Sequence, residues 1–295
     1  MTRTLLPYQT AWVRDPTPLA VIEKSRRIGI SWAEAYHAVM HAGDGRGDIY
    51  YQSYDKDMTR GFIEDCADWV EHLNISAEAM GESFLDNEAR DIQVFRINMG
   101  SGKKILAMTS SPRGFRSKGR PGDVAVIDEA AFVDDIDEVL KAALAFNTWG
   151  GRVRVISTHN GEANPFNALL RDIREGRQPG TLHRVTLREA VGQGLYSRIA
   201  AITGQSDTTD AAHAWEAAIR AQIEALRQPS QRSARSMKSV PSKLTSDSSK
   251  SKGWGSSLGL HAAEQWADLS VARVPSMDGA DVVHHHFVKK IPTLC

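Results

Sequence analysis

The sequence has little cysteine, no long apolar run and no net charge. Its two cysteines, Cys66 and Cys295, lie far apart without partners at metal-ligand spacing, which excludes a disulfide framework and fits a reducing compartment. No stretch approaches the roughly 20 apolar residues of a membrane-spanning helix, and the first residues lack a signal-peptide pattern. We therefore expect an intracellular protein outside the membrane. Lysine plus arginine and aspartate plus glutamate each number 36, so contact with nucleic acid would need a local basic patch.

Hydrophobic periodicity is abundant in the first two thirds of the chain. From residue 5 to about residue 188, short β-branched runs alternate with amphipathic segments, which is typical of βαβ units. We predict an α/β fold with a mainly parallel sheet flanked by helices. The expected strands are Leu19–Ile22, Asp48–Gln52, Ile92–Asn98, Ile105–Thr109, Val124–Ile127, Val153–Ser157 and His183–Thr186. The expected helices are Trp32–Ala42, Asp57–Leu73, Ile136–Leu144 and Pro165–Arg174, followed by Leu195–Thr203 and Ala211–Gln228.

The composition changes at Pro229. Beyond it serine and lysine are frequent and periodic apolar residues are rare, so too little apolar surface is available to offset the entropy of ordering. We expect a sheet domain over residues 1–190 and a helical extension or linker over residues 191–228. A poorly ordered, low-complexity tail is expected over residues 229–295.

A modified phosphate loop lies between the first expected strand and helix, in the stretch AVIEKSRRIGISW. The standard loop reads GxxxxGK[ST], with its lysine directly before the hydroxyl residue. Gly29 and Ser31 match that pattern, but Ile30 takes the lysine position and Lys24 takes the first glycine position. The chemistry is retained, because Lys24 and Arg27 supply cations and Ser31 supplies a hydroxyl for Mg²⁺. The alternative is an ordinary strand–loop–helix corner with surface arginines.

An acidic pair, Asp128 and Glu129, ends the apolar run DVAVIDE. In a Walker B strand the aspartate holds Mg²⁺, and the following glutamate orients and deprotonates the attacking water. Two adjacent carboxylates at the end of a buried strand are costly unless a cation compensates them. The alternative is a strand that runs into an acidic loop, since Asp134, Asp135 and Asp137 follow.

A polar tip ends the expected strand Val153–Ser157, in the stretch RVISTHNG. Ligands of α/β sheets bind at this edge, and a hydroxyl or amide there can sense a γ-phosphate. His159 by itself is more typical of a loop histidine than of a catalyst. A phosphate loop, an acidic pair and a polar tip, in this order, together predict a P-loop NTPase that hydrolyses ATP.

These residues resemble the large terminase subunits of tailed bacteriophages, in particular the branch of Mu-like phages and prophages. The stretch KSRRIGISWAEA, from Lys24, is similar to the loop of that branch, whose lysine is displaced to the front. DEAAF, from Asp128, resembles its Walker B motif, and STHNG, from Ser157, resembles its coupling motif. LPYQ, which ends at Gln9, resembles the segment whose glutamine recognises adenine. The resemblance covers residues 5–228.

The resemblance implies an ATP-driven motor in the cytoplasm of a bacterial host. Such a motor threads double-stranded DNA through a portal protein into a procapsid, works with a small terminase subunit and acts as a homo-oligomeric ring. The implied cofactors are ATP and Mg²⁺.

The resemblance also implies roles for residues of this sequence. Glu129 would act on the water, with Lys24 and Arg27 as further catalytic residues. Ser31 and Asp128 would hold Mg²⁺. The residues implied to couple hydrolysis to movement are Ser157, Thr158 and Asn160. Those implied to bind ATP are Gln9, Lys24, Ser25, Arg26, Arg27, Ile28, Gly29, Ile30 and Ser31.

The chain departs from the family after Pro229. The family normally adds an RNase H-like nuclease, which needs several carboxylates on adjacent strands to hold two metal ions. The acids beyond Pro229 are scattered, so we expect no nuclease activity and interpret the tail as a frameshifted or otherwise aberrant product. Reading the encoding DNA in the other two frames tests this. The consecutive imidazoles of His284, His285 and His286 would point in different directions on a strand, which disfavours a metal site.

Other readings remain open. A helicase-like ATPase has similar loops but needs a second recA-like domain, for which too little chain remains. A catalytically inactive prophage remnant would only bind DNA or capsid and portal proteins. The basic segment Ser110–Arg120 would contact DNA phosphates or the nucleotide, or would form a solvated basic loop.

Overall fold

The computed structural model describes residues 5–227, except residues 74, 76, 86–91, 117 and 162. Residues up to Ala221 form one compact unit. The tail expected over residues 229–295, with its histidine triplet, lies outside the described residues, so the interpretation of the tail stays a prediction. Within the described residues, no helix combines the length and the apolar character needed to cross a membrane.

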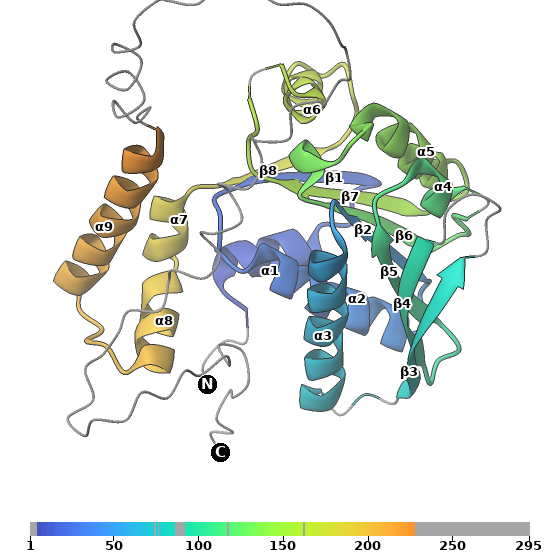
Figure 1. Ribbon diagram of the computed structural model, residues 1–295, viewed down its shortest axis with the longest axis horizontal. Coiled ribbons are helices and arrows are strands. Elements are labelled where there is room, and N and C mark those ends of the chain that lie inside the picture. Colours follow the sequence, from blue (N-terminus) through green and yellow to red (C-terminus); the bar gives the residue numbers. More distant parts are fainter. Residues whose placement is uncertain are drawn as a thin grey trace, which may run out of the picture. The chain divides into compact units, whose positions relative to one another are not determined.

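An eight-stranded sheet occupies the centre of this unit (Figure 1), with the order β3-β4-β5-β2-β6-β7-β1-β8. The strands β5, β2, β6, β7, β1 and β8 run parallel, whereas β4 is antiparallel to both β3 and β5. The strands are β1 Leu19–Lys24, β2 Ile49–Ser53, β3 Ala77–Leu85, β4 Ile92–Met99, β5 Lys104–Thr109, β6 Val124–Asp128, β7 Arg152–Ser157 and β8 Thr181–Val185.

Helices cover both faces of the sheet (Figure 1). The described helices are α1 Pro7–Arg14, α2 Ile30–Gly43, α3 Lys56–His72, α4 Pro112–Phe115, α5 Ile136–Thr148, α6 Pro165–Arg174, α7 Leu187–Gly192, α8 Leu195–Thr203 and α9 Thr209–Arg227, with a 3₁₀ turn at Ala130–Phe132. One apolar cluster packs α1, α2, α3 and α8 on one face. A second packs α4, α5 and α6 on the other. Strands buried on both faces favour continuous apolar runs, which is why β1 begins with LAVI and β6 with VAVI. In contrast, β7 reads RVRVIS, and its Arg154 is buried.

The predicted fold class is confirmed, because the sheet is mainly parallel and flanked by helices. Each predicted strand and helix exists, with ends that differ by a few residues. The prediction missed β3, α1, α4 and α7. The β3 sequence, AEAMGESFL, lacks regular alternation and contains glycine, and it pairs as an antiparallel edge strand. The helices α1, α4 and α7 are short, so their periodicity is weak.

The parallel strands bring the predicted motifs to one edge. In the sheet order, β2, β6, β7 and β1 are consecutive neighbours, and all four run in the same direction. Their carboxyl ends carry Ser53, Asp128, Ser157 and Lys24 respectively. The phosphate loop, the acidic pair and the polar tip therefore lie side by side, although long stretches of sequence separate them.

At the opposite edge, His41 ties α2 to the start of β6. The side chain is buried, and its Nδ1 lies 3.1 Å from Arg152 Nη2 while its Nε2 lies 2.7 Å from Gly122 O. Because a guanidinium only donates, Nδ1 accepts and Nε2–H donates, which defines a neutral tautomer. Burial lowers the pKa of His41 to about 4, and the positive charge of Arg152 acts in the same direction, whereas the bond to Gly122 opposes the shift.

This histidine makes stability depend on pH. Between pH 6.5 and 4 the unfolded chain binds a proton at His41 that the folded chain does not bind. The free energy of unfolding should therefore fall as the pH falls through this window, by about 2 kcal/mol from this group. Urea unfolding at pH 7, 5.5 and 4.5 measures it. His41→Gln retains a donor toward Gly122 and does not titrate, so its stability should change less with pH. An equal pH dependence in both proteins would contradict the assignment.

Candidate active site

The phosphate loop connects β1 directly to α2. Ser25 N–H donates to Val185 O at 2.9 Å, which ties the start of the loop to β8. Gly29 precedes the first residue of α2 with φ +73°, in the left-handed region that favours glycine. A Cβ at Gly29 would lie 2.8 Å from Gln9 Nε2. The free N–H groups of the first turn of α2 follow this glycine, and such a helix start attracts anions.

Lys24 reaches across the edge to the acidic pair. Its Nζ lies 2.7 Å from Glu129 Oε1, and the two residues are 105 positions apart in the sequence. Only 6% of the Lys24 side chain and 16% of the Glu129 side chain are exposed. The ammonium therefore supplies the compensating cation that adjacent buried carboxylates require.

Asp128 is fully buried and accepts three hydrogen bonds. Ser31 Oγ donates to its Oδ2 at 2.6 Å, and Tyr51 OH donates to the same oxygen at 2.9 Å. The Glu129 N–H donates to Oδ1 at 2.8 Å. Burial raises the pKa of Asp128, and the charge of Lys24 and the hydroxyl donors oppose that rise. The loop and the Walker B strand are thus joined directly through Ser31 and Asp128.

Sequence reasoning missed Tyr51. An aromatic residue in a buried strand is normally interpreted as core, and the Tyr51 ring does stack on Phe62 with centroids 3.7 Å apart. Only the register of the sheet indicates that Tyr51 contacts Asp128. Tyr51 pairs with Val126, two residues before Asp128, so the two side chains share a face. Reading that signal requires knowing that β2 lies beside β6.

Glu129 has an unusual backbone. Its φ of +50° and ψ of 41° lie in the left-handed region, which costs a non-glycine residue about 1–2 kcal/mol. Such strain is typical of functional sites, where the surroundings hold a side chain in a required direction. Here the turn directs the Glu129 carboxylate toward Lys24.

The polar tip of β7 contacts the turn that follows the acidic pair. Ser157 Oγ accepts the Ala131 N–H at 2.9 Å, and Asn160 Nδ2 donates to Ala131 O at 3.0 Å. Thr158 Oγ1 is buried and has no hydrogen-bond partner among the described residues. The structure therefore brings Ser157 and Asn160 against the turn after the acidic pair. Their coupling role stays a prediction.

Gln9 lies under the loop with only 2% of its surface exposed. Its Nε2 donates to Gly29 O at 2.9 Å, and its Oε1 accepts the Leu6 N–H at 2.9 Å and lies 3.4 Å from Arg198 Nη1. Both ends of the amide are thus engaged within the chain. Contact with adenine would require exchange of one of these bonds, and it stays a prediction. No local sequence pattern indicated that Arg198 of α8 reaches this amide.

The remaining loop residues divide by burial. The side chains of Ile28 and Ile30 are buried in the core, so only their backbone can face a phosphate. Arg26 and Arg27 are exposed, and the Arg26 guanidinium lies 5.5 Å from the centre of the Phe132 ring.

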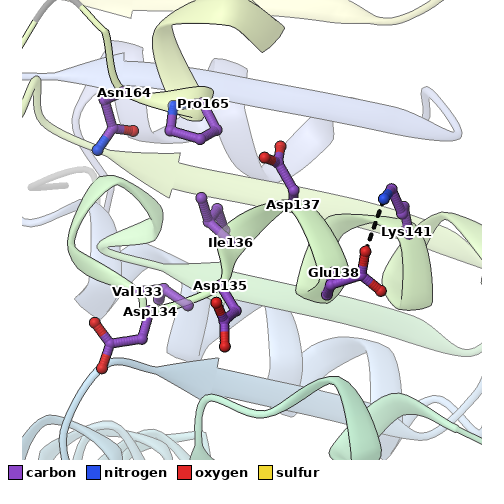
Figure 2. A pocket seen from close by; sticks show the side chains of 9 residues that line it. All are labelled: Val133, Asp134, Asp135, Ile136, Asp137, Glu138, Lys141, Asn164 and Pro165. Atoms are coloured by element: carbon purple, nitrogen blue, oxygen red, sulfur yellow. Dashed lines mark hydrogen bonds and ion pairs between the residues drawn. The ribbon is translucent and has the colours of Figure 1, made fainter.

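A hollow of about 530 Å³ lies beside the start of α5 (Figure 2). Its lining residues are Val133, Asp134, Asp135, Ile136, Asp137, Glu138, Lys141, Asn164 and Pro165. Lys141 is paired with Glu138 at 2.7 Å, which leaves three aspartates in excess. Negative charge disfavours a phosphate here, and none of the predicted ATP-binding residues lines the hollow. The loop edge is therefore the better candidate site for an anion.

The basic segment Ser110–Arg120 divides between the two edges of the sheet. Its first part follows β5 at the loop edge, where Arg113 lies in α4. Its last part leads to the start of β6 at the opposite edge, where Lys118 Nζ lies 5.3 Å from the Tyr50 ring. Lys118 and Arg120 are thus placed away from the phosphate loop, whereas Arg113 is near the loop edge.

The donor set fits Mg²⁺. Mg²⁺ prefers hard oxygen ligands and usually takes one or two from the protein, with water and substrate phosphates completing the shell. The Ser31 hydroxyl and an Asp128 carboxylate oxygen lie 2.6 Å apart, so one ion could contact both. Among the described residues, histidine, cysteine, aspartate and glutamate form no larger group that could hold a metal by itself.

Gly29→Ala tests the loop geometry. The left-handed backbone should cost about 1 kcal/mol or more, and the new Cβ should displace the Gln9 amide. We expect a lower midpoint of urea unfolding than in the native protein. Gly61→Ala is the matched control, because it lies within α3 with nothing within 4 Å of a new Cβ. That change should raise stability by about 0.5–1 kcal/mol. Equal midpoints for Gly29→Ala and the native protein would contradict this geometry.

No protein-family model matches the chain. The Mu-like prophage FluMu protein gp28 of Haemophilus influenzae is 44% identical over 219 residues, which cover 73% of this chain and 42% of that protein. The probable terminase large subunit gp28 of Escherichia phage Mu is 41% identical over 218 residues, which cover 71% of this chain and 39% of that protein. The chain thus spans about two fifths of the length of these curated relatives.

Among solved structures, the large terminase ATPase domain of Thermus phage P74-26 is 16% identical with a TM-score of 0.46, and the match covers 68% of this chain and 88% of that chain. The two sequence relatives confirm the resemblance that the motifs predict.

Proposed function

We propose that this chain, which is related to the large terminase subunits of Mu-like phages, hydrolyses ATP at the edge where the phosphate loop meets the Walker B strand. One observation carries the proposal. Two contacts join these distant segments: Lys24 Nζ to Glu129 at 2.7 Å and Ser31 Oγ to Asp128 at 2.6 Å. A cation, a hydroxyl, a metal-binding carboxylate and a candidate base converge there at a helix start.

Each residue has a role in this proposal. The N–H groups of the loop and of the first turn of α2 bind the phosphates, and Lys24 supplies positive charge beside them. Ser31 and Asp128 would hold Mg²⁺, which would neutralise the negative charge that develops on the phosphates during hydrolysis. Glu129 accepts the proton of the attacking water. Before the nucleotide arrives, the Glu129 carboxylate is paired with the Lys24 ammonium.

We extend the proposal to DNA packaging. One relative is named as a probable terminase large subunit, so the proposed work is translocation of double-stranded DNA into a procapsid. The proposed partners are a portal protein and a small terminase subunit, and the active form is a homo-oligomeric ring. Thr158 and Asn160 would couple hydrolysis to movement. This is supported by the buried, unpartnered Thr158 hydroxyl and by the bond from Asn160 to the turn after the acidic pair.

Glu129→Gln separates hydrolysis from binding. The amide no longer accepts a proton, so kcat for ATP hydrolysis should fall at least about 100-fold. Binding of a fluorescent ATP analogue should persist, since the loop is untouched. The measurement compares DNA-stimulated ATP hydrolysis by the native protein and the variant. If both hydrolyse ATP equally slowly, the enzymatic proposal is wrong and a remnant that only binds is favoured.

Lys24→Ala tests the displaced lysine. It removes the cation beside Glu129, and ATP hydrolysis should be abolished. Ile30→Val is the matched control, because Ile30 takes the usual lysine position but its side chain is buried in the core. That variant should retain hydrolysis and lose only about 0.5–1.5 kcal/mol of stability. Hydrolysis by Lys24→Ala at the native rate would contradict the role of this lysine.

A further inference from the structure

Three buried side chains form one cluster beneath the phosphate loop. Trp12 of α1, Glu34 of α2 and Arg154 of β7 are exposed by 0%, 0% and 1%. Trp12 Nε1–H donates to Glu34 Oε2 at 2.7 Å, and Arg154 Nε–H donates to both Glu34 oxygens at 2.9 and 3.0 Å. The Arg154 guanidinium also lies 4.1 Å from the centre of a Trp12 ring, and its Nη2–H donates to Trp12 O at 2.9 Å. We call these three residues the buried clamp.

His37 completes the shell of the Glu34 carboxylate. Its Nδ1 lies 2.9 Å from Glu34 Oε1, and because a carboxylate only accepts, the histidine donates. Burial, together with the nearby Arg154, lowers the pKa of His37, so the ring is neutral at pH 7. The clamp is therefore a buried ion pair between Arg154 and Glu34, and the Glu34 carboxylate also accepts hydrogen bonds from Trp12 and His37. A buried ion pair persists when additional hydrogen bonds of this kind satisfy its polar groups.

The clamp joins the same elements that carry the candidate site. Trp12 follows Gln9 by three positions on α1, and Glu34 follows Ser31 by three positions on α2. Residues three apart on a helix lie on the same side. Arg154 lies three positions before the polar tip of β7. Each element thus carries one residue at the loop edge and one in the clamp below it.

Two side chains of α1 donate hydrogen bonds to backbone carbonyls of the phosphate loop. Tyr8 OH donates to Ile28 O at 2.6 Å, and Gln9 Nε2 donates to Gly29 O at 2.9 Å. These consecutive carbonyls directly precede α2. A shift of α1 along its axis would break both bonds and change the path of the loop.

Apolar residues could have filled the clamp position. Replacement of a buried ion pair by well-packed apolar residues is often neutral or stabilising. Apolar packing could therefore stabilise this part of the fold about as well as the ion pair does. Directional hydrogen bonds also fix the position of α1 relative to α2, because the Trp12 indole can donate to the Glu34 carboxylate in only one placement of α1.

We propose that the buried clamp positions the phosphate loop for nucleotide by holding α1 where Tyr8 and Gln9 engage the loop carbonyls. Glu34 is a positioning residue, since it acts through α1 and lies below the site. This inference rests on the proposed function, because it concerns nucleotide binding at the same edge.

Glu34→Gln tests the clamp with Asp123→Asn as the matched control. Asp123 is also a buried carboxylate, which accepts the N–H groups of Asp48 and Arg120 at 2.9 Å, but it lies at the opposite edge of the sheet. Both variants should lower the melting temperature. At a temperature where all proteins are folded, Glu34→Gln should raise the Kd of a fluorescent ATP analogue about tenfold. Asp123→Asn should leave that Kd within about twofold of the native value.

Hydrogen exchange supplies a readout that needs no nucleotide. In Glu34→Gln, amides of residues 5–14 and 25–30 should exchange faster than in the native protein, while those of residues 136–148 should not change. Arg154→Lys keeps a charge beside Glu34 but loses the fork that reaches Trp12 O. Its Kd should lie between the native and Glu34→Gln values. If Glu34→Gln does not fold, comparison of the Kd of Arg154→Lys with the native Kd tests the role of the clamp.

The outcomes separate the two proposals. A native protein that binds no ATP analogue would overturn the proposed function. A native protein that binds, with Glu34→Gln or a folded Arg154→Lys binding equally well, would overturn the clamp alone. An equal loss of binding in Asp123→Asn would also overturn it, because the effect would then follow stability rather than the position of α1.

Discussion

Two adjacent carboxylates at the end of a buried strand impose the constraint on which the loop edge depends. Asp128 and Glu129 leave water on folding, and each needs donors or positive charge in return. Three other segments supply them: Lys24 at the end of β1, Ser31 at the start of α2 and Tyr51 on β2. The same bonds that offset the desolvation cost hold the loop against the Walker B strand. Stability and the assembly of the site therefore have one physical cause at this edge.

Glu34, a second buried carboxylate below the phosphate loop, is compensated in the same way. Glu34 takes its donors from α1 and β7, through Trp12 and Arg154. Since α2 carries both Ser31 and Glu34, the helix is fixed at its start and again one turn later. The amide of Gln9 then joins α1 to the loop. The candidate site thus rests on two polar layers that an apolar core packs around, and each layer connects elements far apart in the sequence.

The sequence was most informative where local chemistry is strong. Continuous apolar runs predicted β1 and β6, because strands of a parallel sheet are buried on both faces. It was least informative for β3 and for the short helices α1 and α7, whose patterns are weak and whose stability comes from packing. Spacing and residue type pointed to Lys24, Ser31, Asp128 and Glu129, which the structure brings together at the loop edge. Tyr51 was not, because its role depends on which strand lies beside it.

The sequence by itself determined the residue types at each strand end, the order of strand, loop and helix, and the forward displacement of Lys24. Only the tertiary structure decided the partners. It paired the Lys24 ammonium with Glu129, turned the Gln9 amide toward Gly29 and brought Trp12 and Arg154 to Glu34. The physical reason is that these contacts follow from the order β2-β6-β7-β1 and from the docking of α1. Local propensity encodes which segments become strands, whereas sheet order depends on the packing of the whole chain.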